Sequence, residues 1–171
     1  QYFNNKNDLS DLNMPRFGNQ NGALIDKNFV VIGSFFNDIY SKIIIKYLDE
    51  NKKNFIVDLG AGYGKLAYYI LSKIKNSNFI DFDLPETLVL ASYYLAKSFP
   101  NKKTFFYGEE KFDSDLIKQF DLAFLPNWEF RNLKDNSIDI TINRNSLGEM
   151  EPKSAINYIN HIHRTSKYFF S

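Results

Sequence analysis

The spacing of apolar residues predicts alternating helices and strands from residue 34 onward. Residues 35–48 place apolar side chains three and four positions apart, which is typical of a helix that buries one apolar stripe, with Ser34 as its N-cap. Residues 55–59 form a short apolar run rich in β-formers and end in a glycine cluster. Further elements follow in order: a helix over 66–74, a strand over 78–82, a helix over 85–98, strands over 104–107, 122–125 and 138–143, a helix over 153–165, and a strand from 168. This alternation predicts an α/β fold with a mostly parallel sheet and right-handed connections.

The first 33 residues have a different pattern. They are polar, rich in Asn, and carry the turn-forming pairs Met14-Pro15 and Phe17-Gly18. We therefore expect residues 1–33 to form an N-terminal arm or cap, and residues 34–171 to form the ligand-binding domain.

The composition is that of one globular domain, with 171 residues, 44% hydrophobic and 24% charged. The net charge of +1 argues against a basic surface that binds nucleic acid. The lack of cysteine excludes disulfides and thiolate nucleophiles, and no His, Asp and Glu residues have metal-ligand spacing. No apolar run approaches the roughly 20 residues that cross a bilayer. Because Gln1 replaces Met and no signal-peptide pattern follows, we expect an internal piece of a cytoplasmic protein.

Three glycines follow the predicted strand over 55–59 and precede the next helix, in the sequence DLGAGYG over residues 58–64. A strand that enters a helix through glycines brings backbone N–H groups close to a ligand at the helix N-terminus. The alternative is a tight turn without a ligand. The spacing differs from the dinucleotide fingerprint G-x-G-x-x-G, because Lys65 stands where the third glycine would be.

Asp83 is a second candidate for ligand binding. It ends the second predicted strand, 23 positions after Gly60, where a carboxylate can accept hydrogen bonds from both hydroxyls of a ribose. Alternatively, Asp83 and Glu86 form a D-x-x-E capping box, with Pro85 in the first helical turn. Asp81 is a less suitable ribose ligand because it lies inside the strand.

Residues 57–64 resemble motif I of class I S-adenosylmethionine-dependent methyltransferases. The resemblance implies a Rossmann-like sheet flanked by helices and S-adenosyl-L-methionine as the cofactor. The implied cofactor contacts in the first half are Asp58, Gly60, Gly62, Tyr63, Gly64, Asp83 and Leu84.

Residues 133–139 are related to a run that methyltransferases often show just before the fourth strand, and the implied adenine contacts lie upstream of it, in residues 124–129. Trp128 would stack on the purine, and Asn127 or Glu129 would bond its exocyclic amine. Trp128 as an ordinary core or surface aromatic is the alternative, and Glu109 and Glu110 are rival contacts.

Residues 142–150 follow the fourth main strand, and ligands of open α/β sheets bind beyond the carboxyl ends of strands. Together with 15–19, 83–86 and 168–170, this segment resembles bacterial proteins proposed to be sugar O-methyltransferases. That resemblance implies two more strands beyond Phe170, which the sequence lacks, and a sugar hydroxyl or glycan acceptor. Asn143 would border the cofactor, and Glu149 would be the general base. A solvated or capping Glu149 is the alternative.

Two other functions stay open at this point. One is an NAD-type oxidoreductase on a Rossmann sheet, and the other is a non-catalytic binding module with the methyltransferase fold. His161 and His163, the two histidines of the chain, lie beside a predicted buried stripe of Ala155, Ile156, Ile159 and Ile162 and are expected at its boundary or exposed.

Overall fold

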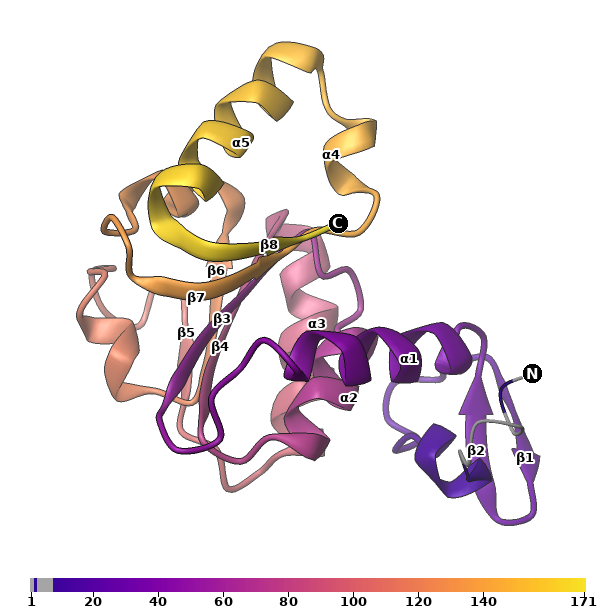
Figure 1. The fold of residues 1–171 in the computed structure, drawn as a ribbon. Coiled ribbons are helices and arrows are strands. Elements are labelled where there is room, and N and C mark those ends of the chain that lie inside the picture. Colours follow the sequence, from indigo (N-terminus) through magenta and orange to yellow (C-terminus); the bar gives the residue numbers. More distant parts are fainter. Residues whose placement is uncertain (1, 3–7) are drawn as a thin grey trace.

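A six-stranded sheet forms the centre of the molecule. The computed structural model describes residue 2 and residues 8–171. The strands are β3 (Asn54–Leu59), β4 (Ser77–Asp83), β5 (Thr104–Phe106), β6 (Leu122–Pro126), β7 (Ile138–Ile142) and β8 (Ser166–Phe170). Their order across the sheet is β5-β6-β4-β3-β7-β8, and every neighbouring pair is parallel (Figure 1). The predicted α/β class with a parallel sheet is confirmed.

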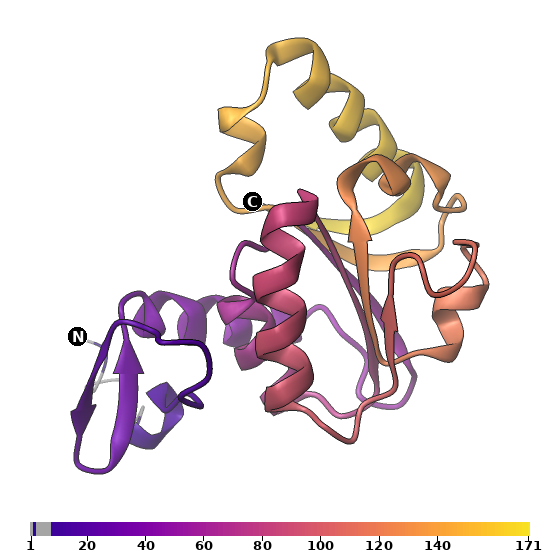
Figure 2. The same ribbon diagram turned by 180° about the vertical axis from the view of Figure 1, so that it is seen from behind.

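Helices cover both faces of this sheet. One face packs against α1 (Ser34–Ile45), α2 (Lys65–Lys73) and α3 (Pro85–Ser98), and α3 is prominent in the rear view (Figure 2). The other face packs against α5 (Pro152–Thr165) and the short helices η3 (Leu116–Gln119) and η4 (Asn127–Asn132). A one-turn helix, α4 (Ser146–Glu149), joins β7 to α5. The predicted strands and helices of residues 54–170 agree with these bounds to within about two residues.

The N-terminal segment contains structure that its composition did not predict. A 3-10 helix, η2 (Leu9–Leu12), precedes an antiparallel hairpin of β1 (Gly22–Ile25) and β2 (Asn28–Val31). Asp26 and Lys27 form the two-residue turn with φ of 44° and 71°. Such turns usually contain glycine or asparagine, so the Asp-Lys pair gave no hairpin signal. Residues 1 and 3–7 of the predicted arm lie outside the described residues.

Helix α1 is oriented opposite to the prediction. Most of its apolar stripe is exposed, with Phe36 at 63% of its full accessibility, although Ile44 is buried. The polar residues Ser34, Asn37, Asp38 and Ser41 are buried instead. The Asp38 carboxylate forms ion pairs with Lys42 at 2.8 Å and Lys73 at 3.0 Å, so the buried polar face is internally neutralised. The predicted N-cap was also wrong, since Gly33 is the N-cap and Ser34 is the first helical residue.

Helix α5 departs from its predicted orientation as well. Ile156 and Ile159 are 60% and 49% exposed, and of the four predicted stripe residues only Ile162 is buried. Within the described part of the chain, no helix combines the length and the apolar character required to span a membrane.

Candidate ligand site at the carboxyl ends of the strands

The glycine loop connects β3 to α2 at the carboxyl edge of the sheet. Gly60 and Gly62 have φ of 79° and 61°, a region that side-chain-bearing residues rarely adopt. The Gly60 N–H donates to the Phe82 carbonyl of β4 at 2.7 Å. A Cβ at Gly60 would lie 2.4 Å from Ser146 Oγ, whereas a Cβ at Gly62 would have open space around it. The loop is therefore closely packed at its first glycine and open at its second.

The third glycine serves the packing of two helices. A Cβ at Gly64 would lie 2.9 Å from Leu95 Cδ1 on α3. In the dinucleotide fingerprint a later glycine allows a helix to pack closely on a strand. Here Gly64, directly before α2, allows the start of α2 to pack closely on α3.

Asp83, the last residue of β4, links this strand to the glycine loop through its carboxylate. Its Oδ2 accepts a hydrogen bond from the Gly62 N–H at 2.8 Å, and its Oδ1 accepts one from the Leu84 N–H at 2.7 Å. Helix α3 begins at Pro85, its N-cap is Leu84, and the cap makes no side-chain hydrogen bond. The capping-box alternative for Asp83 and Glu86 is therefore not observed, and the carboxylate faces the ligand crevice.

Two adjacent cavities lie on either side of the glycine loop. Cavity A has a volume of about 690 Å³ and is lined by Leu59, Gly60, Gly62, Phe82, Asp83, Leu84, Thr87, Asn127, Arg144, Asn145, Ser146, Glu149, Met150, Glu151, Ser154 and Tyr158. Cavity B has a volume of about 700 Å³ and is lined by Ile32, Gly33, Phe36, Asn37, Tyr40, Gly60, Ala61, Gly62, Tyr63, Lys65, Leu66, Arg144, Asn145, Phe170 and Ser171. Because Gly60, Gly62, Arg144 and Asn145 line both, one extended ligand can contact both cavities.

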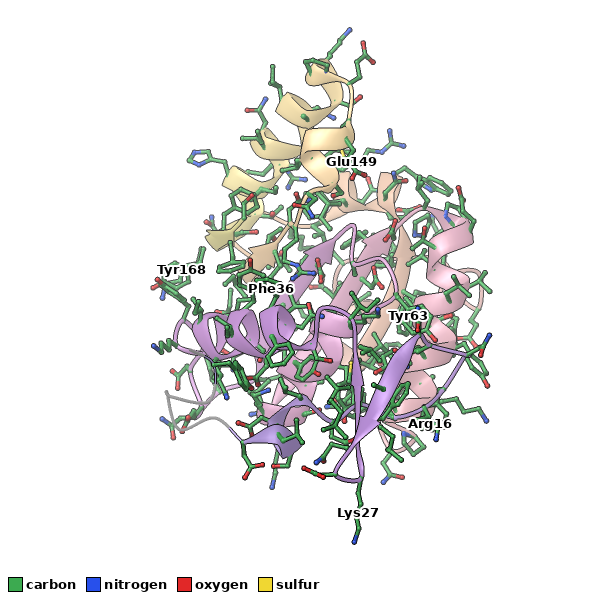
Figure 3. All side chains as sticks on the ribbon, turned by 90° about the vertical axis from the view of Figure 1, so that its right-hand side faces the viewer. Arg16, Lys27, Phe36, Tyr63, Glu149 and Tyr168 are labelled. Carbon is green, nitrogen blue, oxygen red and sulfur yellow. The ribbon has the colours of Figure 1, made fainter. Side chains whose placement is uncertain are left out.

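The predicted contacts Leu84, Asn127 and Glu149 all line cavity A. Glu149 projects from the α4 segment, which is drawn above helix α1 in Figure 3. Trp128 lines neither cavity. Its ring instead makes an edge contact with Tyr107, with centroids 6.4 Å apart. This placement corresponds to the surface-aromatic alternative for Trp128.

Tyr63 lines cavity B but also anchors the N-terminal segment. Its hydroxyl donates to the Phe17 carbonyl at 2.8 Å, and its ring lies 4.9 Å from that of Tyr94. Figure 3 shows Tyr63 beside the N-terminal hairpin.

Asn143 is buried and holds two loops together. Its Nδ2 donates to the Leu59 carbonyl at 2.7 Å and to Ser146 Oγ, and its Oδ1 accepts from the Leu147 N–H at 3.2 Å. These bonds fix the segment after β7 against the glycine loop. Asn143 lines neither cavity, and Gly64 likewise lies outside both linings.

Asp58 lies beneath the loop, with only 3% of its surface exposed, and lines neither cavity. Burial raises the pKa of its carboxyl to about 7, Arg144 opposes this increase and Asp83 adds to it. Its strand neighbour Asp81 is also buried, and its pKa is raised well above the ordinary value by burial and by the charges of Asp58 and Asp83. Among the described residues, both Asp81 oxygens lack a hydrogen-bond partner, which agrees with a protonated carboxyl.

Three further polar residues line cavity B: Asn37, Lys65 and Arg144. Arg144 belongs to the segment 142–150 that was expected beside a ligand, whereas the sequence pattern did not indicate Asn37 or Lys65. Asn37 is 3% exposed, and within the described residues its Oδ1 accepts no hydrogen bond. Lys65 and Arg144 form no ion pair with any described carboxylate. For Asn37 the sequence offered one signal, a polar residue inside an amphipathic helix, and the structure shows that this residue is buried. In the described residues no three His, Asp or Glu side chains are grouped for a metal ion.

The parallel sheet, its flanking helices and the glycine loop define a Rossmann-like fold of the class I methyltransferase type. A solved structure similar to this chain is a protein proposed to be an S-adenosyl-L-methionine-dependent methyltransferase from Methanococcus maripaludis. Its identity is 18% and its TM-score 0.53, over 77% of this chain and 51% of that one.

Two other similar solved structures are described as methyltransferases. The mitomycin 7-O-methyltransferase is 16% identical, with a TM-score of 0.51 over 78% of this chain and 36% of that one. A protein proposed to be an O-methyltransferase from Nostoc punctiforme is 12% identical, with a TM-score of 0.52 over 78% and 35%. The chain thus spans about half of the first structure and about a third of the other two. No protein-family model and no curated protein sequence matches the chain.

Proposed function

We propose that this chain is the S-adenosyl-L-methionine-binding part of a methyltransferase that transfers a methyl group to a sugar hydroxyl. The observation that carries the proposal is the Asp83 carboxylate, held in cavity A by the N–H groups of Gly62 and Leu84. Each carboxylate oxygen retains a lone pair, so the pair of oxygens can accept both hydroxyls of a ribose.

The residues around the loop fit the rest of the cofactor. Leu84 and Asn127 border cavity A, where they can enclose an adenine on its apolar face and bond its amine. On the other side of the loop, Asn37 Oδ1 is a buried acceptor that an α-ammonium group would satisfy. Lys65, the first residue of α2, lines the same cavity and can pair with an α-carboxylate.

S-adenosyl-L-methionine supplies a methyl group already activated by a sulfonium, so the protein has mainly to align the acceptor and exclude water. In the transfer the hydroxyl oxygen forms a bond to the methyl carbon as the carbon–sulfur bond breaks. Glu149 in cavity A is our proposed base for the hydroxyl proton. The sugar assignment rests on the resemblance of residues 15–19, 83–86, 142–150 and 168–170 to bacterial sugar O-methyltransferases.

Calorimetric titration with S-adenosylhomocysteine and with NAD(H) tests the cofactor assignment. We expect S-adenosylhomocysteine to bind and NAD(H) to bind much more weakly. Tighter binding of NAD(H) would overturn the proposal in favour of an oxidoreductase. Binding of S-adenosylhomocysteine without methylation of any acceptor, in a screen of sugars and glycans with labelled cofactor, would instead support a non-catalytic module.

Asp83→Asn tests the ribose contact. Loss of charge-assisted hydrogen bonds is expected to weaken S-adenosylhomocysteine binding roughly 10- to 100-fold. Glu86→Gln is the matched control, because Glu86 is exposed in the first turn of α3 and lines neither cavity. Equal affinities of Asp83→Asn and the wild type would refute the contact.

A further inference from the structure

Cavity B has more room and a different surface than the amino-acid end of a cofactor requires. Its volume is about 700 Å³, within the range of complete small-molecule sites. Asn37 and Lys65 lie beside the glycine loop, but Phe36, Tyr40 and Phe170 form a separate aromatic wall. The wall comes from α1 and β8, and none of its three side chains is used by the cofactor proposal.

The aromatic wall includes two residues of the α1 apolar stripe, Phe36 and Tyr40. The rings of Phe36 and Tyr40 are stacked with centroids 6.4 Å apart, and Tyr40 meets Phe170 edge-on at 5.7 Å. Phe36 remains 63% exposed. Grouped exposed aromatic side chains beside a cavity are characteristic of a surface that binds a ligand. Aromatic faces pack well against the apolar face of a sugar ring or against another ring.

The charge of cavity B is opposite to that of cavity A. Cavity B is lined by Lys65 and Arg144 and by no Asp or Glu side chain. Cavity A shares Arg144 but is also lined by Asp83, Glu149 and Glu151, so its carboxylates outnumber its cation. Cavity B therefore favours an anion.

Arg144 lies against the aromatic wall. Its guanidinium lies 5.1 Å from the centre of the Tyr40 ring. If Lys65 pairs with the cofactor carboxylate, one cation of the cavity remains without an anionic partner among the described residues. A guanidinium in this position can bond a carboxylate or a phosphate through two N–H groups.

We infer that cavity B is the acceptor site and takes a ring compound that carries an anionic group, such as a sugar acid or a sugar phosphate. Arg144 holds the anion, and Phe36, Tyr40 and Phe170 pack on the ring. Because Gly60 and Gly62 line both cavities, the acceptor and the cofactor meet at the glycine loop, and the hydroxyl that receives the methyl group extends from there toward Glu149 in cavity A. This inference rests on the proposed methyltransferase function, since it assigns the second substrate of that reaction.

Two probes that differ in one charge test the inference. The affinities of p-nitrophenyl β-glucuronide and p-nitrophenyl β-glucoside are measured by ligand-observed NMR on the whole chain, with and without S-adenosylhomocysteine. We expect the glucuronide to bind about tenfold more tightly, with an advantage that decreases as salt is added. Equal affinities, or no binding of either probe, would overturn the inference.

Variants identify the residues responsible. Arg144→Gln should remove the preference for the glucuronide. Because Arg144 also lines cavity A, the affinity for S-adenosylhomocysteine is measured alongside and should change less than the affinity for the glucuronide. Phe36→Ala should weaken both probes. Arg131→Gln is the control, because it removes the same charge from an exposed site outside both cavities. A loss of S-adenosylhomocysteine binding in Arg144→Gln, with both probes unaffected, would assign Arg144 to the cofactor and overturn the inference.

The same titrations separate this inference from the function on which it rests. If S-adenosylhomocysteine binds and the probes do not discriminate, only the acceptor inference fails. If S-adenosylhomocysteine does not bind at all, the methyltransferase proposal fails, whatever the probes do.

Discussion

Single residues of the glycine loop have separable effects, because the same substitution meets different surroundings at each position. Gly60→Ala places a methyl group 2.4 Å from Ser146 Oγ at a φ of 79°. We expect it to lower the free energy of unfolding by about 2–4 kcal/mol, from backbone strain and overpacking. Urea denaturation measures this loss.

Gly62→Ala is expected to behave differently. The new methyl group meets no atom within 4 Å, so only backbone strain remains, about 1–2 kcal/mol. That methyl group would project from a residue that lines both cavities, so ligand binding should suffer more than stability. A Gly62→Ala protein that binds S-adenosylhomocysteine normally would contradict the site.

The buried carboxyl of Asp58 makes stability depend on pH. Its pKa in the folded protein, about 7, exceeds the ordinary 3.8, so between these values the folded state holds a proton that the unfolded chain releases. This contribution to stability is complete below about pH 4, is lost progressively as the pH rises, and is gone above about pH 7. Asp81 acts in the same direction.

Asp58→Asn should therefore make the unfolding free energy fall less steeply with pH, by about 1.4 kcal/mol per pH unit in the middle of this range. Asp26→Asn, in the exposed turn of the hairpin, should leave the slope unchanged. Denaturation at a series of pH values compares the three proteins. Parallel curves for Asp58→Asn and the wild type would mean that the carboxyl is ionised in the folded state.

At the scale of elements, α1 shows the limit of periodicity. The apolar spacing correctly predicts a helix, but it gave the wrong buried face, because it does not reveal that Asp38 finds Lys42 and Lys73 as partners. Burial of a charge becomes acceptable only with such partners, and one of them comes from another helix. The sequence around Asp38 does not reveal its contact with Lys73, which lies 35 residues further along the chain.

Two substitutions on α1 test its observed orientation. Ile44→Ala, at a residue with no exposed surface, should cost about 2–4 kcal/mol in unfolding free energy. Phe36→Ala, on the exposed stripe, should cost less than about 1 kcal/mol. Thermal and urea denaturation give both values. Equally large losses at the two positions would restore the predicted orientation, in which both side chains are buried.

At the scale of the whole molecule, the parallel sheet and the edge of it that carries the two cavities were predictable from sequence. Periods of hydrophobicity identify strands and helices, and the alternation of the two restricts how they connect. Gly62 and Asp83 could be placed together because the ends of neighbouring parallel strands meet at one edge. Arg144 falls within residues 142–150, which were expected beside a ligand. Asn37 was not predicted, because it reaches cavity B through the packing of α1.

The N-terminal segment is joined to the rest of the molecule at the crevice itself. Tyr63→Phe removes the hydrogen bond to the Phe17 carbonyl. We expect residues 13–20 to open more easily by about 1 kcal/mol, and the amide hydrogens there to exchange correspondingly faster. Hydrogen exchange monitored by mass spectrometry measures this, with exposed Tyr93→Phe as the control. Unchanged exchange would show that other contacts hold the segment.

The two main-chain N–H groups that hold the Asp83 carboxylate have a consequence for recognition. They hold the side chain in one orientation in the folded protein, so the side chain loses its rotational freedom when the chain folds. A molecule that bonds to Asp83 meets a rigid acceptor and gains its hydrogen bonds without ordering a mobile side chain. Discrimination between a vicinal diol and a deoxygenated ring is correspondingly sharp, because a fixed pair of oxygen atoms cannot adjust to a missing hydroxyl.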